Sequence, residues 1–300
     1  MDYCVFIQAN HKQMLGAIVA EYALRRNSRN NDKFDVRIMR YEDIPVFLEH
    51  EGDVFLRDGG KRVWVRNDLQ SFTPSRFLPP QLMGYSGRAA VIDPDVFALG
   101  DVWELLSRDM HGKAIMCRPK SGNKGKRGCL ATSVMLLDCA KLPHWKFAEQ
   151  FNAMFEFKRD YMKWVCLKYE DPETIGLFEN KWNDFDHLTD QTKMLHTTKR
   201  KHQPWKTGLP IDYRPADSFR LFPPRHWLRR TRRALFGDYG LLGTYGKHPD
   251  SNQENFFFGL VRECLEQGVI TEAQLRDEMR WNHLRHDALE VLERTPPLAT

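Results

Sequence analysis

Residues 88–95 read Arg-Ala-Ala-Val-Ile-Asp-Pro-Asp, and this stretch decides the fold. Its apolar centre is short and ends in two β-branched side chains, which is typical of a buried strand. Pro94 ends that strand, because proline cannot donate to a sheet ladder. In extended backbone, residues i and i+2 point the same way. Asp93 and Asp95 can therefore converge on one site at the carboxyl end of the strand, where open α/β sheets collect their ligands.

The segments before this stretch predict a parallel sheet with helices on its faces. Residues 4–9 form a short apolar run, residues 14–23 carry apolar side chains at helical spacing, and residues 34–39 look like a second strand. A strand, a helix and a strand in this order are typical of an α/β fold. We expect further strands at 113–117, 132–137 and 194–196, helices at 102–108 and within 145–169, and a flexible basic loop at 118–128.

The character of the chain changes near residue 215. Arginine-rich and glycine-rich segments follow, and then two helices are predicted, whose starts read as capping boxes at Ser251-x-x-Glu254 and Thr271-x-x-Gln274. Gly268 is expected to close the first of them. The sequence therefore predicts a domain over 1–215 and a helical C-terminal region over 216–300.

Composition excludes several classes of protein. The chain has 300 residues, a formal charge of +5, and eight Trp and nineteen Phe, which is too much apolar surface for a disordered protein. No stretch approaches the ~18–20 uncharged apolar residues of a membrane span. The charge is too mild to imply nucleic acid. Asp2 and the short apolar run after it do not resemble a signal peptide, so we expect a cytoplasmic protein.

The six cysteines support the same expectation. They include no C-x-x-C pair, and a chain of this length needs no disulfides to fold. We therefore expect reduced thiols at all six positions, which are Cys4, Cys117, Cys129, Cys139, Cys166 and Cys264.

Two interpretations of the Asp-Pro-Asp stretch are open at this point. Paired carboxylate oxygens are suitable ligands for Mg²⁺ or Mn²⁺, especially where phosphates complete the coordination. A solvated turn without any ligand is the alternative, and for an isolated D-x-D it is the more common case.

Four motifs in order resemble the family 8 glycosyltransferases and their GT-A relatives, of the bacterial type. The first is the stretch 75–105, in which a strand ends in D-x-D and a Leu-Gly-Asp segment follows. The second, 131–138, is similar to the family's N-A-G-V-L-L-I-N strand. Trp182-Asn183 resembles its W-N pair, and 196–205 resembles its closing H-x-x-G-x-x-K-P-W. Together the motifs cover roughly residues 3–210.

The resemblance implies a GT-A (Rossmann-like) fold with a mixed, mainly parallel sheet flanked by helices. It implies a retaining glycosyltransferase of surface-polysaccharide biosynthesis, with a UDP-linked nucleotide sugar as donor. The acceptor would be a glycan, a lipid-linked sugar or a protein. Asp93, Asp95 and His196 would hold Mn²⁺ or Mg²⁺, which would stabilise the charge on the departing diphosphate.

The same resemblance suggests further site residues. Asp138 and Asp171 are the candidate catalytic or acceptor-aligning residues. Contacts to the nucleotide sugar are expected from Gln8, Ala9, Asn10, Arg88, Asp93, Pro94, Asp95, Lys199, Gln203 and Lys206. For each of these the alternative is a purely structural residue.

The sequence departs from the family pattern in three places. Ala131 stands where family members usually carry Asn, and the closing motif is one residue longer. Within that motif, Lys199 occupies the expected Gly and Gln203 the expected Lys. Neutralisation of the phosphates could therefore fall to Lys199, Lys201 or Lys206.

The segment 225–236 has the pattern of a basic amphipathic helix. Its arginines and Trp227 fit either an anionic membrane surface or a helix packed on the domain. A peripheral membrane contact is thus one of two interpretations.

The alternative to an enzymatic function is a degenerate, non-catalytic module that binds anionic lipid or nucleic acid. Nucleic acid is not expected, because aromatic side chains are not interleaved with the basic clusters.

Overall fold

The computed structural model describes residues 2–120, 129–213, 231, 235 and 243–298. The chain divides into two compact units, Met1–His196 and Thr197–Thr300. The boundary expected near 215 and most of the basic segment 225–236 lie outside the described residues, as does most of the loop 118–128.

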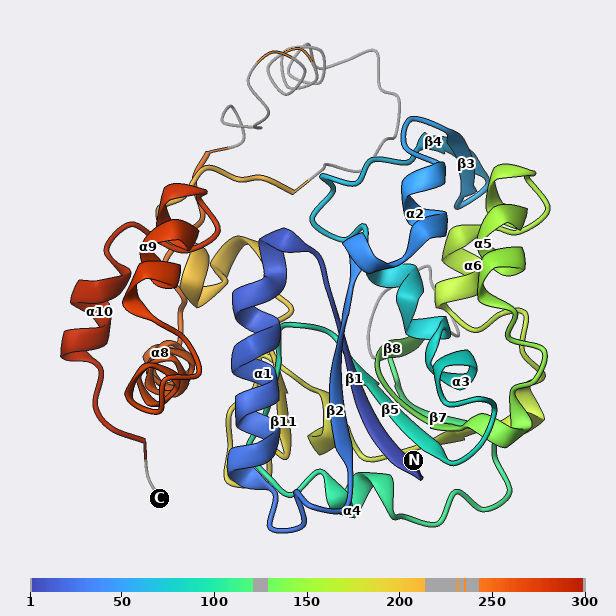
Figure 1. Cartoon of the computed structure of the whole chain (residues 1–300), viewed down its shortest axis with the longest axis horizontal. Helices are drawn as coiled ribbons and strands as arrows, with labels where there is room; N and C mark the ends of the chain where they lie inside the picture. The colour runs from blue at the N-terminus through green and yellow to red at the C-terminus, as the bar shows by residue number, and fades with distance from the viewer. Residues whose placement is uncertain (1, 121–128, 214–230, 232–234, 236–242, 299–300) are drawn as a thin grey trace. The chain divides into compact units, whose positions relative to one another are not determined.

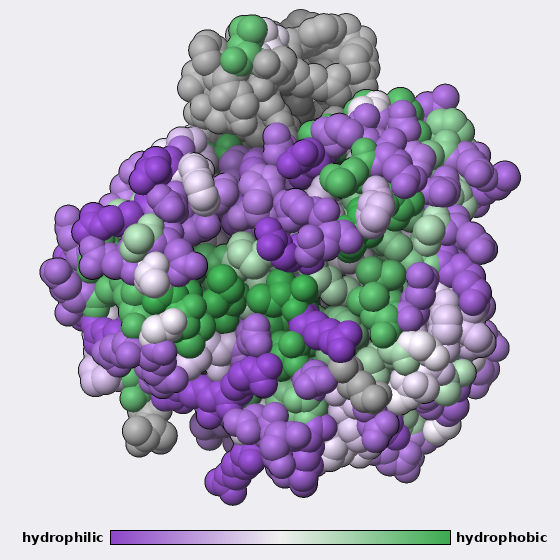
Figure 2. Space-filling view, viewed as in Figure 1, coloured by the Kyte–Doolittle hydropathy of each residue, from purple (hydrophilic) through white to green (hydrophobic). Residues whose placement is uncertain are grey.

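No helix among the described residues is both long and apolar enough to cross a bilayer. Polar and charged side chains make up most of the face shown in Figure 2, as the mean hydropathy of −0.57 implies.

The first unit is built on a mixed six-stranded sheet (Figure 1). Its order is β2 (Asp35–Arg40), β1 (Tyr3–Ala9), β5 (Arg88–Ile92), β8 (Leu130–Asp138), β7 (Ile115–Pro119) and β9 (Ile175–Leu177). β1 pairs in parallel with β2 and β5, and β7 pairs in parallel with β9. β8 is antiparallel to both of its neighbours. The expected α/β class and mainly parallel sheet are confirmed.

One helix covers β1 and β2 and touches the turn after β5. A 3-10 turn, η1 (His11–Gln13), leads from β1 into α1 (Met14–Asn27), which runs beside these strands in Figure 1. A Cβ at Gly16 would lie 2.6 Å from the carbonyl oxygen of Pro94. Glycine is therefore needed here to let the helix approach the Asp93–Asp95 turn.

An aromatic cluster packs several short elements together in the first unit. It joins α2 (Pro45–Glu49), the hairpin of β3 (Val54–Arg57) and β4 (Gly60–Val63), and the helices α5 (Phe147–Phe155) and α6 (Tyr161–Val165). At its centre Phe47 stacks on Tyr41 and contacts Phe151 at a ring-centroid distance of 4.9 Å. The hairpin and α2 were not expected from the sequence. The other short elements are η2 (Tyr41–Asp43), η3 (Thr73–Phe77), α3 (Pro79–Leu82), α4 (Trp103–Leu106), η4 (Cys139–Lys141), η5 (Pro172–Thr174) and η6 (Asn180–Asn183).

A small second sheet places β11, at the end of the first unit, beside the Asp-Pro-Asp turn. Its order is β10 (Asp184–Phe185), β11 (Met194–His196) and β6 (Val96–Ala98). β11 is antiparallel to β6, with His196 opposite Val96. Because β6 begins directly after Asp95, this register places the last residue of β11 beside the turn.

The second unit is helical in its described C-terminal part. It contains η7 (Arg200–His202), η8 (Pro204–Lys206), α8 (Ser251–Glu266), α9 (Glu272–Arg280) and α10 (Ala288–Arg294). The predicted capping box at Thr271 and Gln274 is confirmed, and Gly268 follows α8 with φ +70°. The predicted box at Ser251 is wrong, because Asp250 is the cap and accepts from the Asn252 amide.

The expectation of six reduced thiols is wrong for two cysteines. Cys129, just before β8, and Cys166, just after α6, form a disulfide with their Cα atoms 4.7 Å apart. The other four, Cys4, Cys117, Cys139 and Cys264, are free and buried. Burial raises the pKa of each of these four thiols to about 12, so they carry little thiolate at neutral pH.

Candidate functional site

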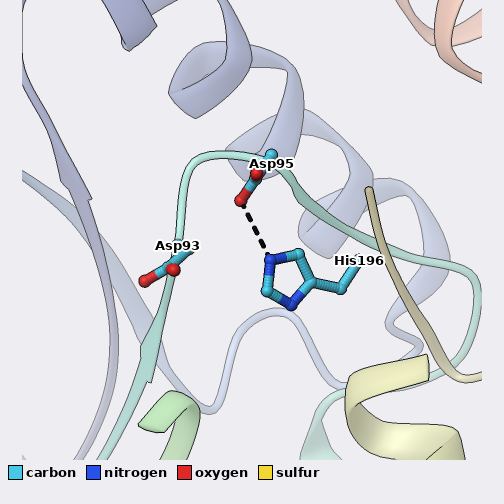
Figure 3. Close-up of side chains that lie close together, drawn as sticks. All are labelled: Asp93, Asp95 and His196. Carbon is cyan, nitrogen blue, oxygen red and sulfur yellow. Dashed lines mark ion pairs between the residues drawn. The ribbon is translucent and has the colours of Figure 1, made fainter. Parts of the chain in front are cut away.

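Three potential metal ligands meet at the carboxyl end of β5. Asp93 and Asp95 flank Pro94 in the turn that joins β5 to β6, and His196 ends β11. One ligand atom from each of these side chains lies within 4.8 Å of the other two. Figure 3 shows the Asp95 carboxylate directed at the imidazole, while the carboxylate of Asp93 points to the other side of the turn.

The orientation of His196 is set by Asn183. The His196 Nδ1 lies 2.8 Å from the Asn183 Oδ1, and the amide Nδ2 of Asn183 donates to the Ser133 hydroxyl at 3.0 Å. With its amide nitrogen used in this way, Asn183 presents its oxygen to the imidazole, so Nδ1 carries a proton. The backbone of Asn183 is held as well, because Arg118 Nη1 donates to its carbonyl at 2.6 Å.

This arrangement leaves Nε2 of His196 facing the Asp95 Oδ1 at 3.3 Å. A neutral imidazole with its proton on Nδ1 has a lone pair on Nε2. Two electron-pair donors then face each other across a buried gap, which is unfavourable unless a positive charge lies between them. A proton on Nε2 or a metal ion supplies that charge. The gap between Nε2 and Oδ1 therefore suits a cation.

Asp93 is held by a separate group of side chains. Arg76 Nη2 donates to its Oδ1 at 2.9 Å, and the Gln8 amide donates to the same oxygen. Arg76 is itself fixed by a 2.6 Å hydrogen bond from Nη1 to the Thr132 hydroxyl. The Ser75 hydroxyl donates to the side-chain oxygen Oε1 of Gln8 at 3.3 Å, which leaves the Nε2 of Gln8 to face the carboxylate.

The ionisable groups of the cluster favour bound positive charge. Burial raises the pKa of Asp93, and Asp95 raises it further, against the opposing effect of Arg76. Burial lowers the pKa of His196, but Asp95 and Asp93 outweigh burial and leave that pKa raised. Without a cation, both groups therefore hold protons more readily than they would in water.

The donor set also fits a divalent ion in its chemistry. Carboxylates suit Mg²⁺ and Mn²⁺, and an imidazole favours the transition metal of the two. Ligands on opposite sides of Mg²⁺ lie at most about 4.2 Å apart. The ligand atoms lie within 4.8 Å of one another, so they would have to approach by up to roughly half an ångström to reach that spacing.

The residues predicted at the end of β1 lie near the cluster but have different tasks. Gln8 contacts Asp93 directly. Asn10 is buried, and its side chain bonds to the Asp68 carbonyl, to Ser71 and to the Lys12 amide. These contacts give Asn10 a structural role, because they hold the turn after β1 in place. Ala9 is fully buried at the end of β1.

Three other predicted residues are not brought to the cluster. Arg88 begins β5 and pairs with Asp138 at the end of β8, so both lie at the opposite end of the strand, roughly 16 Å from Asp93 along the backbone. The guanidinium of Arg88 donates to the carbonyls of Leu106 and Arg108. Asp171 caps η5 before β9, at the same far end, because β9 begins at Ile175 opposite Ile115.

The predicted phosphate ligands belong to the second unit. Lys199 is exposed at the start of η7, and Gln203 precedes η8 and is buried. The ammonium of Lys206 lies 3.2 Å from the Asp212 carboxylate and donates to the Asn282 carbonyl at 3.1 Å. In this structure the charge of Lys206 is thus compensated within its own unit.

Two residues around the cluster were not among the candidates from the sequence. Arg76 contacts Asp93, which Arg88 does not, and Asn183 positions His196. Both lie inside motifs quoted above, in the stretch 75–105 and in the Trp-Asn pair, so a signal for each was available. What the sequence lacked was the sheet register that tells which basic residue reaches the turn.

No protein-family model matches the sequence, and no curated protein matches it. Solved structures show a remote likeness. Mouse xyloside xylosyltransferase 1, in its apo form, is 14% identical over 66% of this chain and 98% of that one, with a TM-score of 0.43. The glycosyltransferase GlyE of Streptococcus pneumoniae TIGR4 is 14% identical over 69% of this chain and 58% of that one, with a TM-score of 0.48.

The galactosyltransferase LgtC, solved in complex with donor and acceptor sugar analogs, is 10% identical over 67% of this chain and 89% of that one, with a TM-score of 0.47. At identities of 10–14% and TM-scores below 0.5, these similarities carry no inference about activity. Function has to be argued from the site itself.

Proposed function

We propose that the chain is a metal-dependent, retaining glycosyltransferase that takes a sugar from a nucleotide sugar, UDP-linked by the family 8 resemblance. The acceptor would be a glycan, a lipid-linked sugar or a protein. One observation carries the proposal. His196 and Asp95 are about a hundred positions apart in the chain, and the fold sets them face to face with a gap that calls for positive charge.

In this proposal, Asp95 and His196 are the principal ligands of Mn²⁺ or Mg²⁺, and Asp93 completes the set. When bound, the ion supplies positive charge to the diphosphate leaving group. Burial raises the pKa of Asp93, and Arg76 opposes this effect, so Arg76 would help the carboxylate to lose its proton when the ion binds. Asn183 keeps the Nε2 lone pair of His196 directed at the metal position.

The donor would lie over the carboxyl ends of β1 and β5, where Gln8 and the Asp-Pro-Asp turn meet. Gln8 and Asp93 already share a hydrogen bond there. Contacts from Pro94, Ala9 and the neighbouring backbone, and from Lys199 and Gln203 in the second unit, rest on the family resemblance.

The test combines metal binding with turnover. Titration calorimetry with Mn²⁺ should show one site in the full chain, and release of UDP from a UDP-sugar panel should depend on Mn²⁺. Asp95→Asn should weaken Mn²⁺ binding and reduce turnover by roughly a hundredfold or more, because it removes a ligand and the charge facing His196. Asp93→Asn should reduce both, since it removes the third ligand.

Asp35→Asn is the matched control. It neutralises an exposed carboxylate at the start of β2, at the far end of the same sheet, and we expect Mn²⁺ affinity and UDP release within about twofold of wild type. Unchanged metal binding in both Asp93→Asn and Asp95→Asn would overturn the proposal. A wild-type chain that binds neither Mn²⁺ nor a UDP-sugar would favour the degenerate binding module instead.

A further inference from the structure

The imidazole of His196 has an aromatic neighbour besides its hydrogen-bonding partners. β10 and β11 pair in parallel, and Phe185 stands directly opposite His196. Residues directly opposite each other on paired strands place their side chains on the same face of the sheet. The Phe185 ring accordingly packs against the imidazole, with the ring centroids 5.3 Å apart and an angle of 77° between the planes. Phe185 is therefore a second support of the imidazole, in addition to Asn183.

One guanidinium contacts both of these supports. Arg118 lies near the end of β7, and its Cζ is 4.1 Å from the centre of the Phe185 ring. Its Nη1 donates to the backbone carbonyl of Asn183 at 2.6 Å. The same side chain thus contacts the residue that packs on the imidazole and the residue whose Oδ1 faces its Nδ1.

The charge of Arg118 is compensated by three consecutive residues. Arg118 is buried, with only 4% of its surface exposed, and a buried charge is costly unless it has partners. Burial lowers the pKa of Arg118, and the negative charge of Asp184 opposes this effect. With the Asn183 carbonyl and the Phe185 ring, the partners of this cation are residues 183, 184 and 185. The arginine and the segment that supports His196 therefore hold each other in place.

The geometry of the guanidinium matters for these contacts. It is planar, so it can stack on an aromatic ring and direct an N–H group at a carbonyl at the same time. The ammonium group of a lysine is a compact charge on a flexible stem and does not combine the two contacts in this way.

We propose that Arg118 is a positioning residue for His196 and acts on the imidazole through Asn183 and Phe185. With the segment held, the Asn183 oxygen stays on Nδ1, and the lone pair of Nε2 is directed at Asp95. Without Arg118, the imidazole gains an alternative, in which Nε2 carries the proton and donates it to Asp95. The effect on metal affinity rests on the proposed function, whereas the effect on the tautomer does not.

The test variants are Arg118→Lys and Phe185→Leu in the full chain. Arg118→Lys keeps the positive charge but loses the planar stack and the directed N–H group. Phe185→Leu leaves the buried charge in place, so it carries the test if the arginine variant does not fold. Arg57→Lys is the matched control, because Arg57 also stacks on an aromatic ring of the first unit, that of Tyr161 at 4.3 Å.

The first measurement is made in EDTA, without metal. Long-range proton–nitrogen NMR spectra of the histidine-labelled chain show which ring nitrogen carries the proton at an alkaline pH where the imidazole is neutral. The His196 signals are identified by their absence in His196→Gln. Wild type and Arg57→Lys should carry the proton on Nδ1. The form protonated on Nε2 should appear in Arg118→Lys and, to a smaller extent, in Phe185→Leu.

The second measurement is Mn²⁺ binding by titration calorimetry. Loss of a partner that orients a metal-binding imidazole commonly costs about 10–100-fold in affinity, so we expect roughly tenfold weaker binding in Arg118→Lys. Phe185→Leu should bind Mn²⁺ more weakly than wild type but less so than Arg118→Lys. Arg57→Lys should stay within about twofold of wild type.

The two measurements separate this proposal from the proposed function. A wild-type chain that binds no Mn²⁺ would contradict the proposed function, and the NMR spectra would still decide the role of Arg118. Wild-type His196 signals in a folded Arg118→Lys protein would overturn that role. If this variant does not fold, wild-type signals in Phe185→Leu would do so. An equal change in Arg57→Lys would also overturn it, because it would show a general loosening of the unit, as would a wild-type chain with the proton on Nε2.

Discussion

At the scale of single residues, the tautomer of His196 determines what the site can do. Asn183 fixes this tautomer by accepting a hydrogen bond from Nδ1, and the side-chain amide of Asn183 is itself fixed by Ser133. Asn183 and Ser133 are both neutral, so the hydrogen bonds that orient the imidazole do not depend on the ionisation of these two partners. Partners of this kind commonly tune metal affinity as strongly as the ligands do.

Asn183→Ala should therefore weaken Mn²⁺ binding by roughly 10–100-fold, because the imidazole loses the acceptor that keeps Nε2 directed at Asp95. The measurement is titration calorimetry with Mn²⁺, with circular dichroism to confirm folding. Asn180→Ala, three positions earlier in η6 and exposed, is the matched control and should bind Mn²⁺ as wild type does. Equal affinity in both variants would contradict this role of Asn183.

The sequence could predict the cluster but only part of its surroundings. The motifs singled out Asp93, Asp95 and His196 as ligands, and the structure places all three side chains at one turn. Arg88 was a candidate from the family resemblance, and it is close in sequence to the D-x-D. A five-residue strand carries such a neighbour to the far edge of the sheet, whereas Arg76 returns to the near edge through η3. Proximity along the chain is a poor guide wherever a strand lies in between.

At the scale of secondary-structure elements, α1 supports the turn that holds the two aspartates. The Pro94 carbonyl sits where a side chain at Gly16 would be. A glycine inside a helix normally costs about 1 kcal/mol relative to alanine, so its presence in α1 has to be explained by packing.

Gly16→Ala should reverse the usual helix preference. We expect the free energy of unfolding to fall by about 1–2 kcal/mol, because the overpacking cost of ~1–3 kcal/mol exceeds the gain in helix propensity. Mn²⁺ affinity should fall with it as the Asp93–Asp95 turn is displaced. Urea unfolding and calorimetry measure the two effects.

Gly100→Ala is the comparison for this variant. The three atoms nearest to a Cβ there all belong to the flexible side chain of Lys193, so stability and Mn²⁺ affinity should stay close to wild type. A Gly16→Ala protein that is more stable than wild type and binds Mn²⁺ normally would show that α1 does not constrain the turn.

Most long elements could be predicted from the sequence, and most short ones could not. β1, α1, β2, β5 and β8 have strong apolar patterns and were expected within a few residues. The hairpin β3–β4 has the sequence Val-Phe-Leu-Arg-Asp-Gly-Gly-Lys-Arg-Val with a mixed polar pattern. Phe55 packs on Trp64, directly after the hairpin, and on Tyr161. The second of these contacts joins distant parts of the chain, and local patterns do not contain it.

At the scale of the whole molecule, a covalent link adds to the packing of the first unit. Cys129 and Cys166 tie the start of β8 to the end of α6 across a separation of 37 residues. Nothing in the spacing of the six cysteines indicated this pair, because the fold alone brings the two thiols together.

Reduction of this disulfide should lower the free energy of unfolding by about 4 kcal/mol, the chain-entropy value for a loop of that length. Urea unfolding with and without dithiothreitol tests this. A Cys166→Ser variant should lose a similar amount and should not respond further to the reductant. Thiol titration of the denatured, unreduced chain should count the four free cysteines, and a count of six would show that the pair is not formed.

The late position of His196 has a consequence for how the protein is made. The two carboxylates leave the ribosome about a hundred residues before the imidazole that faces them, a delay of roughly 5–20 s at common rates of translation. During that interval a nascent chain would offer Asp93 and Asp95 without their partner. If the cluster binds the ion proposed above, all three ligands are available only after β11 has been synthesised and paired with β6. Metal binding by stalled chains of increasing length would then show when the first unit is complete.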